Sequence, residues 1–237
     1  MRHLEIELWS QRDSLLHRRH AGLLLVALVL FLISVSSIKP AEATRYMLVH
    51  AALIAVAAPF ANLPLLSILA RAAAVLPFSA ILSLLTAFAG DTSSAALLLA
   101  KSYLSACAAV LTLGVLGVPR FTRALASLGA PEPLVAVLQL IYRYLLLLVS
   151  EAQSMLIAAR VRGGGNNRKL AFSAATGSAT TLFSRAYDRA NRIHQAMLSR
   201  SYHGELQTVH REQFRFGDTL FLTFVLVLLT LRFYIWR

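Results

Sequence analysis

The sequence has few charged residues and a single cysteine. Of its 237 residues, 14% are charged and 57% are hydrophobic, and the mean hydropathy is +0.64. Soluble domains are typically about 25% charged and about 45–50% apolar, so this chain has too little polar surface to cover a soluble globule. The same composition excludes disordered, collagen-like and coiled-coil chains. Because Cys107 is alone, an internal disulfide and a multi-cysteine metal site are excluded as well. The composition is typical of a helical protein that crosses a membrane several times.

Basic side chains outnumber acidic ones, and the excess is concentrated in one block. Lys and Arg total 23, Asp and Glu total 11, and the net charge is +12. Residues 119–216 hold thirteen of the basic and five of the acidic side chains, a net charge of +8. Such a block can face nucleic acid, an anionic leaflet or an acidic protein groove. In a membrane protein the positive-inside bias places it in the cytoplasm, and we expect no nucleic-acid partner.

Hydrophobic runs with at most one charged residue each predict an all-α membrane protein with about five transmembrane helices, some of them short or broken. The runs are 21–38, 46–60, a broken pair over 64–89, 93–117, and 219–236. Asp91 or Thr92 is expected to N-cap the fourth of these. We therefore predict an N-terminal membrane region over 1–118 with about four hydrophobic helices, a largely cytoplasmic region over 119–216, and a C-terminal transmembrane helix over 217–237. The N-terminus is expected in the cytoplasm and the C-terminus outside.

The basic block predicts two long helices. The first is apolar over 134–148, becomes mixed afterwards, and stops at the glycine and asparagine residues of 163–167. The second covers 168–201, and Arg185, Asp188, Arg189 and Arg192 are spaced so that opposite charges can pair along one face. Small residues allow two helices to approach closely. Those expected at the helix crossing are Ala171, Ala174, Ala175, Gly177 and Ser178.

Motifs for catalysis and metal binding are lacking in the sequence. It has no phosphate-binding loop of the G-x-x-x-x-G-K-[S/T] type, no H-E-x-x-H pair, and no carboxylate cluster within a span. The pairs His17–His20 and His203–His210 lack a convincing third ligand. Ionisable residues inside membrane spans are candidates for function, but Arg71, Lys101 and Arg143 each lie near an expected helix end, where snorkelling is sufficient. We therefore expect no enzyme activity, no cofactor and no metal on this chain.

Arginines at the two helix ends are the remaining candidates. Arg160 and Arg162 precede Gly163 at the end of the first helix, and Ser199, Arg200 and Ser201 close the second. Cations at helix C-termini can simply complement the helix dipole, which contributes about 0.3–1 kcal/mol each. The alternative is docking, because a guanidinium is well suited to a carboxylate-lined protein groove. Repetition of the pattern on two neighbouring helices favours docking.

Four segments of this block resemble a known family. They are 125–131 (LASLGAP), 141–144 (IYRY) followed by Glu151, 158–163 (AARVRG) and 196–204 (AMLSRSYHG). Together they resemble the transmembrane (T) component of energy-coupling factor ABC transporters, specifically its cobalt-type member CbiQ. The close resemblance covers residues 119–205. Ser201 stands where the family usually has glycine.

The resemblance implies an all-α scaffold in a bacterial cell (inner) membrane with a cytoplasmic pair of crossed coupling helices. It implies docking of the chain to two ABC ATPase subunits (CbiO type), which hold ATP and Mg. A membrane substrate-binding subunit (CbiM type, with or without CbiN) would hold the cobalt. The ATPase-docking residues implied are Arg160, Arg162, Gly163, Ser199, Arg200 and Ser201. Alternatives are the same subunit serving nickel or biotin uptake, an unrelated channel or secondary transporter, and a lipid-active membrane enzyme.

Overall fold

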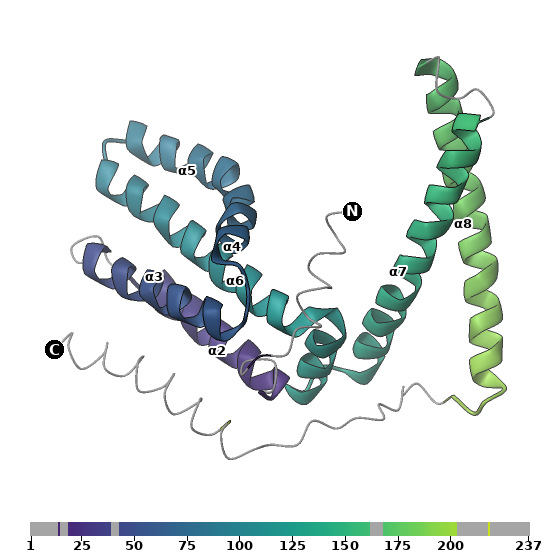
Figure 1. Ribbon diagram of the computed structural model, residues 1–237, viewed down its shortest axis with the longest axis horizontal. Coiled ribbons are helices and arrows are strands. Elements are labelled where there is room, and N and C mark those ends of the chain that lie inside the picture. Colours follow the sequence, from purple (N-terminus) through teal and green to yellow (C-terminus); the bar gives the residue numbers. More distant parts are fainter. Residues whose placement is uncertain (1–13, 15–18, 39–42, 162–167, 203–217, 219–237) are drawn as a thin grey trace. The chain divides into compact units, whose positions relative to one another are not determined.

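The computed structural model describes residues 14, 19–38, 43–161, 168–202 and 218, and every regular element among them is helical (Figure 1). The elements are α2 (Ala21–Ser36), α3 (Ala43–Phe60), α4 (Leu65–Ala72), the 3₁₀ turn η2 (Ala73–Val75), α5 (Leu76–Phe88), α6 (Thr92–Ser127), α7 (Glu132–Ala159) and α8 (Arg168–Leu198). The predicted all-α class is confirmed. The chain forms two compact units: unit 1 comprises residues 1–128 with 210–237, and unit 2 comprises residues 129–209.

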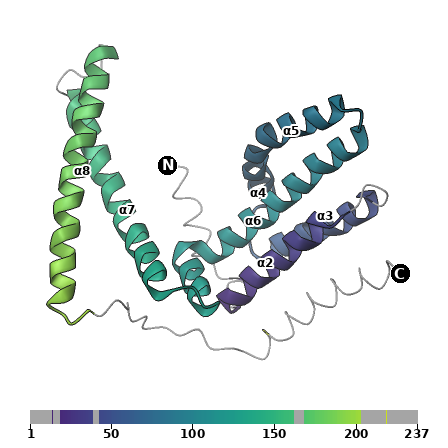
Figure 2. The same ribbon diagram turned by 180° about the vertical axis from the view of Figure 1, so that it is seen from behind.

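Helix α6 is the centre of unit 1. It contacts α2, α3, α4 and α5, as the front and back views show (Figures 1 and 2). The core on this helix is built from small and aliphatic side chains, including Ala58, Ile68, Cys107, Val115 and Leu116, each at most 1% exposed. Burial of this apolar surface between helices fixes the relative positions of α2 and α6, which carry the polar cluster described below.

The predicted break over 64–89 is present as a 3₁₀ turn. Pro64 is the N-cap of α4, η2 separates α4 from α5, and Pro77 lies in the first turn of α5, where a proline needs no backbone hydrogen-bond donor. The predicted N-cap is also confirmed, because the Asp91 carboxylate accepts a hydrogen bond from the Ser94 backbone N–H at 3.0 Å. Hydrogen bonds from Ser94 and from the Ser93 hydroxyl lower the pKa of Asp91 to about 2.

Helix α6 contains a sharp kink at Gly117. Its backbone angles are φ 59° and ψ 170°, a region that is essentially restricted to glycine. Pro119 follows, and the hydroxyl of the buried Thr122 donates to the Pro119 carbonyl at 3.0 Å. The kink therefore divides α6 into a long apolar helix and a short segment, 118–127. This agrees with the end of the hydrophobic run predicted at residue 117.

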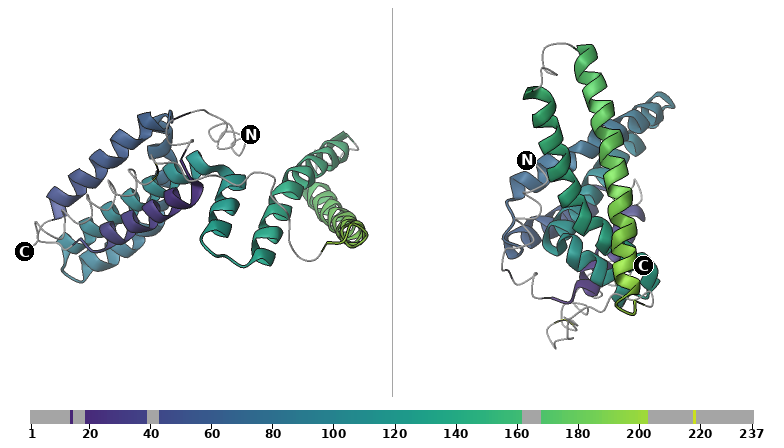
Figure 3. Two further views of the ribbon diagram at one scale, coloured as in Figure 1. Left: turned by 90° about the horizontal axis from the view of Figure 1, so that it is seen from below. Right: turned by 90° about the vertical axis from the view of Figure 1, so that its right-hand side faces the viewer.

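Unit 2 is an antiparallel hairpin of α7 and α8, which lie side by side (Figure 3). Half-buried residues recur every three or four positions along α8: Ala174, Ser178, Leu182, Ala186, Arg189, Ile193 and Met197. This spacing places them on one face of the helix. Helix α8 therefore packs along α7 through one stripe and leaves its other faces exposed.

Three helical stretches are long and apolar enough to cross a membrane: Leu65–Phe88, Thr92–Ser127 and Glu132–Ala159. The apolar helices Ala21–Ser36 and Thr44–Phe60 are shorter, and the expected span 219–236 lies outside the described residues. These helices agree with an all-α membrane protein. The count of five crossings, the cytoplasmic coupling helices and the three-part division of the chain remain predictions.

Candidate functional site

The C-terminus of helix α8 is closed by two backbone hydrogen bonds. The N–H of Tyr202 donates to the carbonyl of Met197, and the N–H of Ser201 donates to the carbonyl of Leu198, both at 3.1 Å. These two bonds form a Schellman motif, which requires a left-handed residue directly after the C-cap. Ser201 is that residue, with φ 57°. Glycine favours this conformation, so Ser201 keeps the backbone shape of the helix end, and Arg200 is the exposed C-cap.

Helix α7 also ends at an exposed arginine. Arg160 is its C-cap, and its backbone N–H donates to the carbonyls of Leu156 and Ile157. Arg162 and Gly163 lie outside the described residues. The docking role predicted for Arg160, Arg162 and Gly163 at this end, and for Ser199, Arg200 and Ser201 at the other, remains a prediction.

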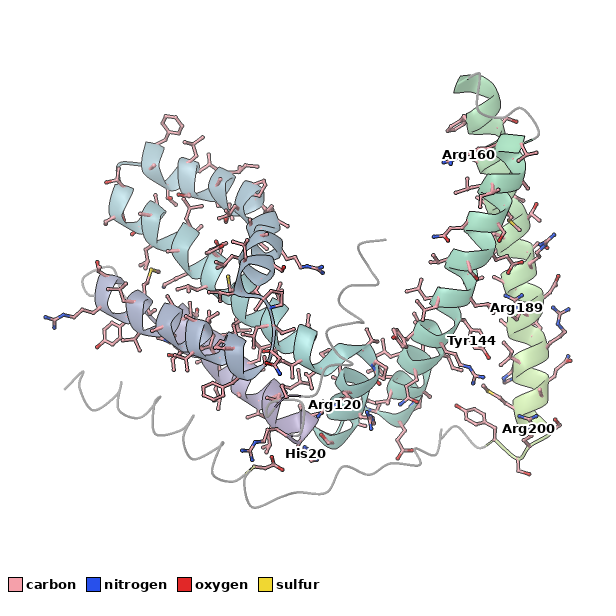
Figure 4. All side chains as sticks on the ribbon, in the orientation of Figure 1. His20, Arg120, Tyr144, Arg160, Arg189 and Arg200 are labelled. Atoms are coloured by element: carbon pink, nitrogen blue, oxygen red, sulfur yellow. The ribbon has the colours of Figure 1, made fainter. Side chains whose placement is uncertain are left out.

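Arg160 and Arg200 lie at opposite ends of the hairpin (Figure 4). This follows from the antiparallel pairing, because each arginine is at the C-terminus of its own helix. With a rise of about 1.5 Å per residue, the 31 residues of α8 span about 46 Å. The two guanidinium groups are therefore well separated along the hairpin.

The two helices are joined midway by a carboxylate that two arginines share. Glu151 of α7 accepts hydrogen bonds from Arg185 at 3.3 Å and from Arg189 at 3.1 Å. We predicted that these arginines could pair with Asp188 on the same helix, and here the structure differs. Arg185 and Arg189 lie one turn apart on the face of α8 that meets α7, so the carboxylate of Glu151 is the nearer partner. The interaction connects the helices rather than stabilising α8 alone.

The small residues of α8 differ in exposure. Ala174 and Ser178 are half-buried in the packing stripe, whereas Ala175 and Gly177 are exposed. A Cβ atom added at Gly177 would meet no atom within 4 Å. Ala171 belongs to α8, but its side chain is outside the described set. A close helix crossing through these five residues remains a prediction.

A second polar cluster joins three distant parts of unit 1, and we call it the α2 clamp: Arg19, His20, Arg120 and Asp218. The Arg120 guanidinium donates to the Arg19 carbonyl at 2.6 Å. Asp218 is 1% exposed; its carboxylate accepts a hydrogen bond from the His20 backbone N–H at 3.5 Å and lies 3.7 Å from the Arg19 guanidinium. Figure 4 shows His20 and Arg120 together at the start of α2. The pattern of the sequence did not indicate this cluster.

Two polar residues inside the membrane region have structural partners. His50 is buried on α3; its Nδ1 donates to the Tyr46 carbonyl at 2.6 Å, which leaves Nε2 to accept from the Ser34 hydroxyl at 2.9 Å. Lys101 donates to the Ser36 carbonyl at the end of α2, at 2.8 Å. In the sequence, His50 stands out as a polar residue within an uncharged run. The sequence analysis did not select it as a candidate. In the described part of the chain, no three His, Cys, Asp or Glu side chains converge as a metal site.

Residues 14–210 match the cobalt transport protein family CbiQ. The chain belongs to the CbiQ family. The family match includes the start of α2 at the clamp and all of unit 2, whereas Asp218 lies beyond its end.

Two similar proteins come from Methanocaldococcus jannaschii. The uncharacterized protein MJ1571 is 30% identical to the CbiQ-family chain over 113 residues, which are 47% of this chain and 39% of MJ1571. The uncharacterized protein MJ1089 is 32% identical over 93 residues, which are 38% of this chain and 35% of MJ1089. The matched part is thus little more than a third of the length of each relative.

Proposed function

We propose that this chain is the coupling subunit of an ATP-driven cobalt importer of the energy-coupling factor type. It would link two ABC ATPase subunits (CbiO type) to a substrate-binding membrane subunit (CbiM type, with or without CbiN) in the cell membrane. The observation that carries the proposal is the pair of exposed arginines at opposite ends of one hairpin. Because Glu151 pairs with Arg185 and Arg189, the helix ends at Arg160 and Arg200 lie about 33 Å apart. Two ends at this separation suit two separate grooves, one on each ATPase subunit.

The proposed chemistry is divided among the subunits. The ATPase subunits hold ATP and Mg, the substrate-binding subunit holds cobalt, and this chain is non-catalytic. Its task is mechanical, and the shared carboxylate of Glu151 supports that task. By joining α7 to α8 midway along the hairpin, Glu151 makes it harder for the two ends to move independently.

The α2 clamp supports the proposed topology. Arg120 and Asp218 both contact residues 19–20 at the start of α2. The chain from residue 120 to residue 218 therefore begins and ends at the same side of the membrane region. That stretch must therefore cross the membrane an even number of times. Helix α8 carries Arg185, Asp188 and Arg189 near its middle, and each charge costs about 2.5–3.5 kcal/mol at the bilayer centre. In the proposed topology α8 stays outside the bilayer, and an even count then requires α7 to stay outside it as well, despite its length and apolar character.

The topology is tested with reporter fusions after Gly165 and after Arg237. We expect the first reporter in the cytoplasm, because of the positive-inside bias, and the second outside. A fusion after Gly90 is the matched control and should report the outside. Reporters on the same side at Gly165 and Arg237 would refute the topology.

The docking role is tested by alanine substitutions in the co-expressed complex. A buried charge pair that loses one partner costs about 2–5 kcal/mol, whereas an exposed ion pair contributes about 0–1 kcal/mol. Arg162→Ala and Arg200→Ala should therefore weaken ATPase pull-down by about 30-fold or more and reduce cobalt uptake. Lysine should restore binding only in part, because it lacks the planar fork of arginine.

Two further arginines serve as controls for the loss of charge. Arg192→Ala removes an exposed cation two turns before Arg200 on α8 and should leave ATPase binding unchanged. Arg160→Ala tests which of the two arginines of this motif docks, and we predict a smaller loss of ATPase binding than for Arg162→Ala. Wild-type assembly and uptake in both Arg162→Ala and Arg200→Ala would contradict the docking role.

A further inference from the structure

Helix α7 carries an exposed apolar stripe along most of its length. Five large apolar side chains, each 44–56% exposed, recur at spacings of seven, four, four and seven residues: Leu134, Ile141, Leu145, Val149 and Leu156. These spacings place them on one face of the helix. Positions nine residues farther on, two and a half turns away, lie on the opposite side. For the first three members of the stripe these positions are polar and exposed: Arg143, Ser150 and Ser154. Helix α7 is therefore amphipathic.

Helix α8 has a matching stripe on the same side of the hairpin. On α7 the exposed Leu145 directly follows the half-buried Tyr144, and on α8 the exposed Phe183 directly follows the half-buried Leu182. One residue is a rotation of about 100°, in the same sense on every α-helix. Because α7 and α8 are antiparallel neighbours (Figure 3), this rotation away from their contact turns both stripes to one side. Phe183 is 73% exposed and Tyr187, one turn later, is 61% exposed. We call this side of the hairpin the apolar face.

The charge of the hairpin indicates what the apolar face contacts. Residues 129–202 hold nine basic and three acidic side chains, a net charge of +6. One of the three carboxylates, Glu151, is shared by Arg185 and Arg189. Basic helices with an apolar face bind anionic membrane surfaces, where the apolar side chains enter the headgroup boundary. The cytoplasmic surfaces of membrane proteins are themselves basic. Charge therefore favours an anionic leaflet over another membrane protein as the partner.

The hairpin also begins close to the membrane region. The hydroxyl of Ser127, at the end of α6, lies beside the first turn of α2, because a Cβ atom added to Gly22 would be 2.5 Å from it. In the proposed topology this end of α2 is at the cytoplasmic surface. Residues 128–131 join Ser127 to α7, and a segment of that length extends at most about 18 Å. The cytoplasmic leaflet is thus within reach of the start of α7.

We propose that the hairpin of α7 and α8 lies along the cytoplasmic leaflet and inserts its apolar face among anionic lipids. The inference rests on the proposed function, because it requires the hairpin to be cytoplasmic. It gives the apolar stripe of α7 a partner without a membrane crossing. The polar side of α7, with Arg143 and Ser154, then faces the cytoplasm.

The test is fluorescence quenching on the full chain in vesicles of phosphatidylglycerol and phosphatidylcholine. Cys107→Ala removes the one native cysteine. A small fluorophore is attached to single cysteines at four exposed positions. Leu145→Cys and Phe183→Cys report on the apolar face. Ser154→Cys and Thr181→Cys are their matched controls on the other side of the same helices. One quencher is a lipid with a nitroxide on its acyl chain, and the other is iodide on both sides of the membrane.

The ratio of lipid quenching to iodide quenching should be severalfold higher at Leu145 and Phe183 than at Ser154 and Thr181. In vesicles of phosphatidylcholine alone this difference should fall severalfold, because the cations of the hairpin lose their anionic partners. Ile141→Cys is a second site on the stripe of α7, in case a label at Leu145 disturbs the helix. Pull-down of the ATPase by the labelled chains in detergent should equal that of the wild type, because detergent contains no anionic leaflet.

Three results would overturn the proposal. One is strong iodide quenching at all four positions; with normal ATPase pull-down, it would leave the proposed function standing. Another is protection of Leu145 and Phe183 from both quenchers, which would identify a protein as the occupant of the apolar face. The third is an unchanged difference in phosphatidylcholine vesicles, which would exclude recognition of anionic lipid. Lipid quenching of Leu145 and Ser154 alike, without iodide quenching, would place α7 inside the bilayer and refute the proposed topology as well.

Discussion

Gly22 permits a close approach between α2 and the end of α6 that one methyl group would disrupt. A Cβ atom added to Gly22 would lie 2.5 Å from the Ser127 hydroxyl oxygen, whereas ordinary contacts are 3.4–4 Å. The hydroxyl would have to move by about 1 Å. It donates to the Ala124 carbonyl at 2.8 Å, so the movement would also break a hydrogen bond. Overpacking of this kind costs about 1–3 kcal/mol.

We therefore expect Gly22→Ala to lower the free energy of unfolding by about 1–2 kcal/mol, because the gain in helix propensity offsets part of the clash. Gly177→Ala is the matched control. The space beside Gly177 is open and the residue lies inside α8, so alanine there should raise stability by about 0.5–1 kcal/mol. The same chemical change should thus have opposite signs at the two positions.

The measurement is thermal unfolding of the purified chain in detergent, with the two single variants and the double variant Gly22→Ala/Ser127→Ala. Ser127→Ala removes the oxygen that clashes and should restore most of the lost stability. A Gly22→Ala variant as stable as the wild type would refute the packing argument. So would a double variant no more stable than Gly22→Ala alone.

Two further predictions concern the hairpin. Glu151→Ala should loosen α7 from α8 and speed amide hydrogen exchange in the middle of α8, while Asp188→Ala should not. Because Arg185 and Arg189 are 58% and 31% exposed, water screens the contact and Glu151→Ala should lower overall stability only slightly. Equal exchange in both variants would contradict the shared-carboxylate contact. Ser201→Gly should stabilise the end of α8 by about 1 kcal/mol and slow exchange of its last amides, since glycine carries no left-handed penalty. Ser201→Val should speed that exchange, and identical rates in the two variants would exclude the left-handed stop.

Local features of this fold could be predicted from the sequence. Asp91 as an N-cap, the break over 64–89 and the interruption after residue 117 each depend on a few neighbouring residues with strong backbone preferences. Proline removes a backbone donor, glycine admits conformations closed to other residues, and aspartate satisfies the free N–H groups of a helix start. These effects act within one or two turns, so the residue types alone indicate them.

Long-range polar contacts could not be predicted in the same way. Arg120 and Asp218 meet the start of α2 across 101 and 198 residues of sequence. Their pairing depends on how α6 bends and packs, and nothing within a few residues of Asp218 indicates its partner. Glu151 is a similar case: on α8 alone, Asp188 is the evident partner for Arg185 and Arg189. The facing helix α7 supplies a better-placed carboxylate. Predicting this contact would require knowing which faces of α7 and α8 meet.

The lengths of the two helices in the hairpin of unit 2 set the distance between its two arginine ends. The gap between Arg160 and Arg200 is set by the number of residues in α7 and α8, at about 1.5 Å per residue. A heptad added to each helix at matched positions would keep the half-buried stripe nearly in register and widen the gap by about 10 Å. Four residues added to α8 alone would instead shift Arg185 and Arg189 past Glu151. The length of the hairpin and the residues at its two ends can therefore be varied separately. A redesigned chain with longer or shorter helices could span a wider or narrower assembly while Arg160 and Arg200 stay unchanged.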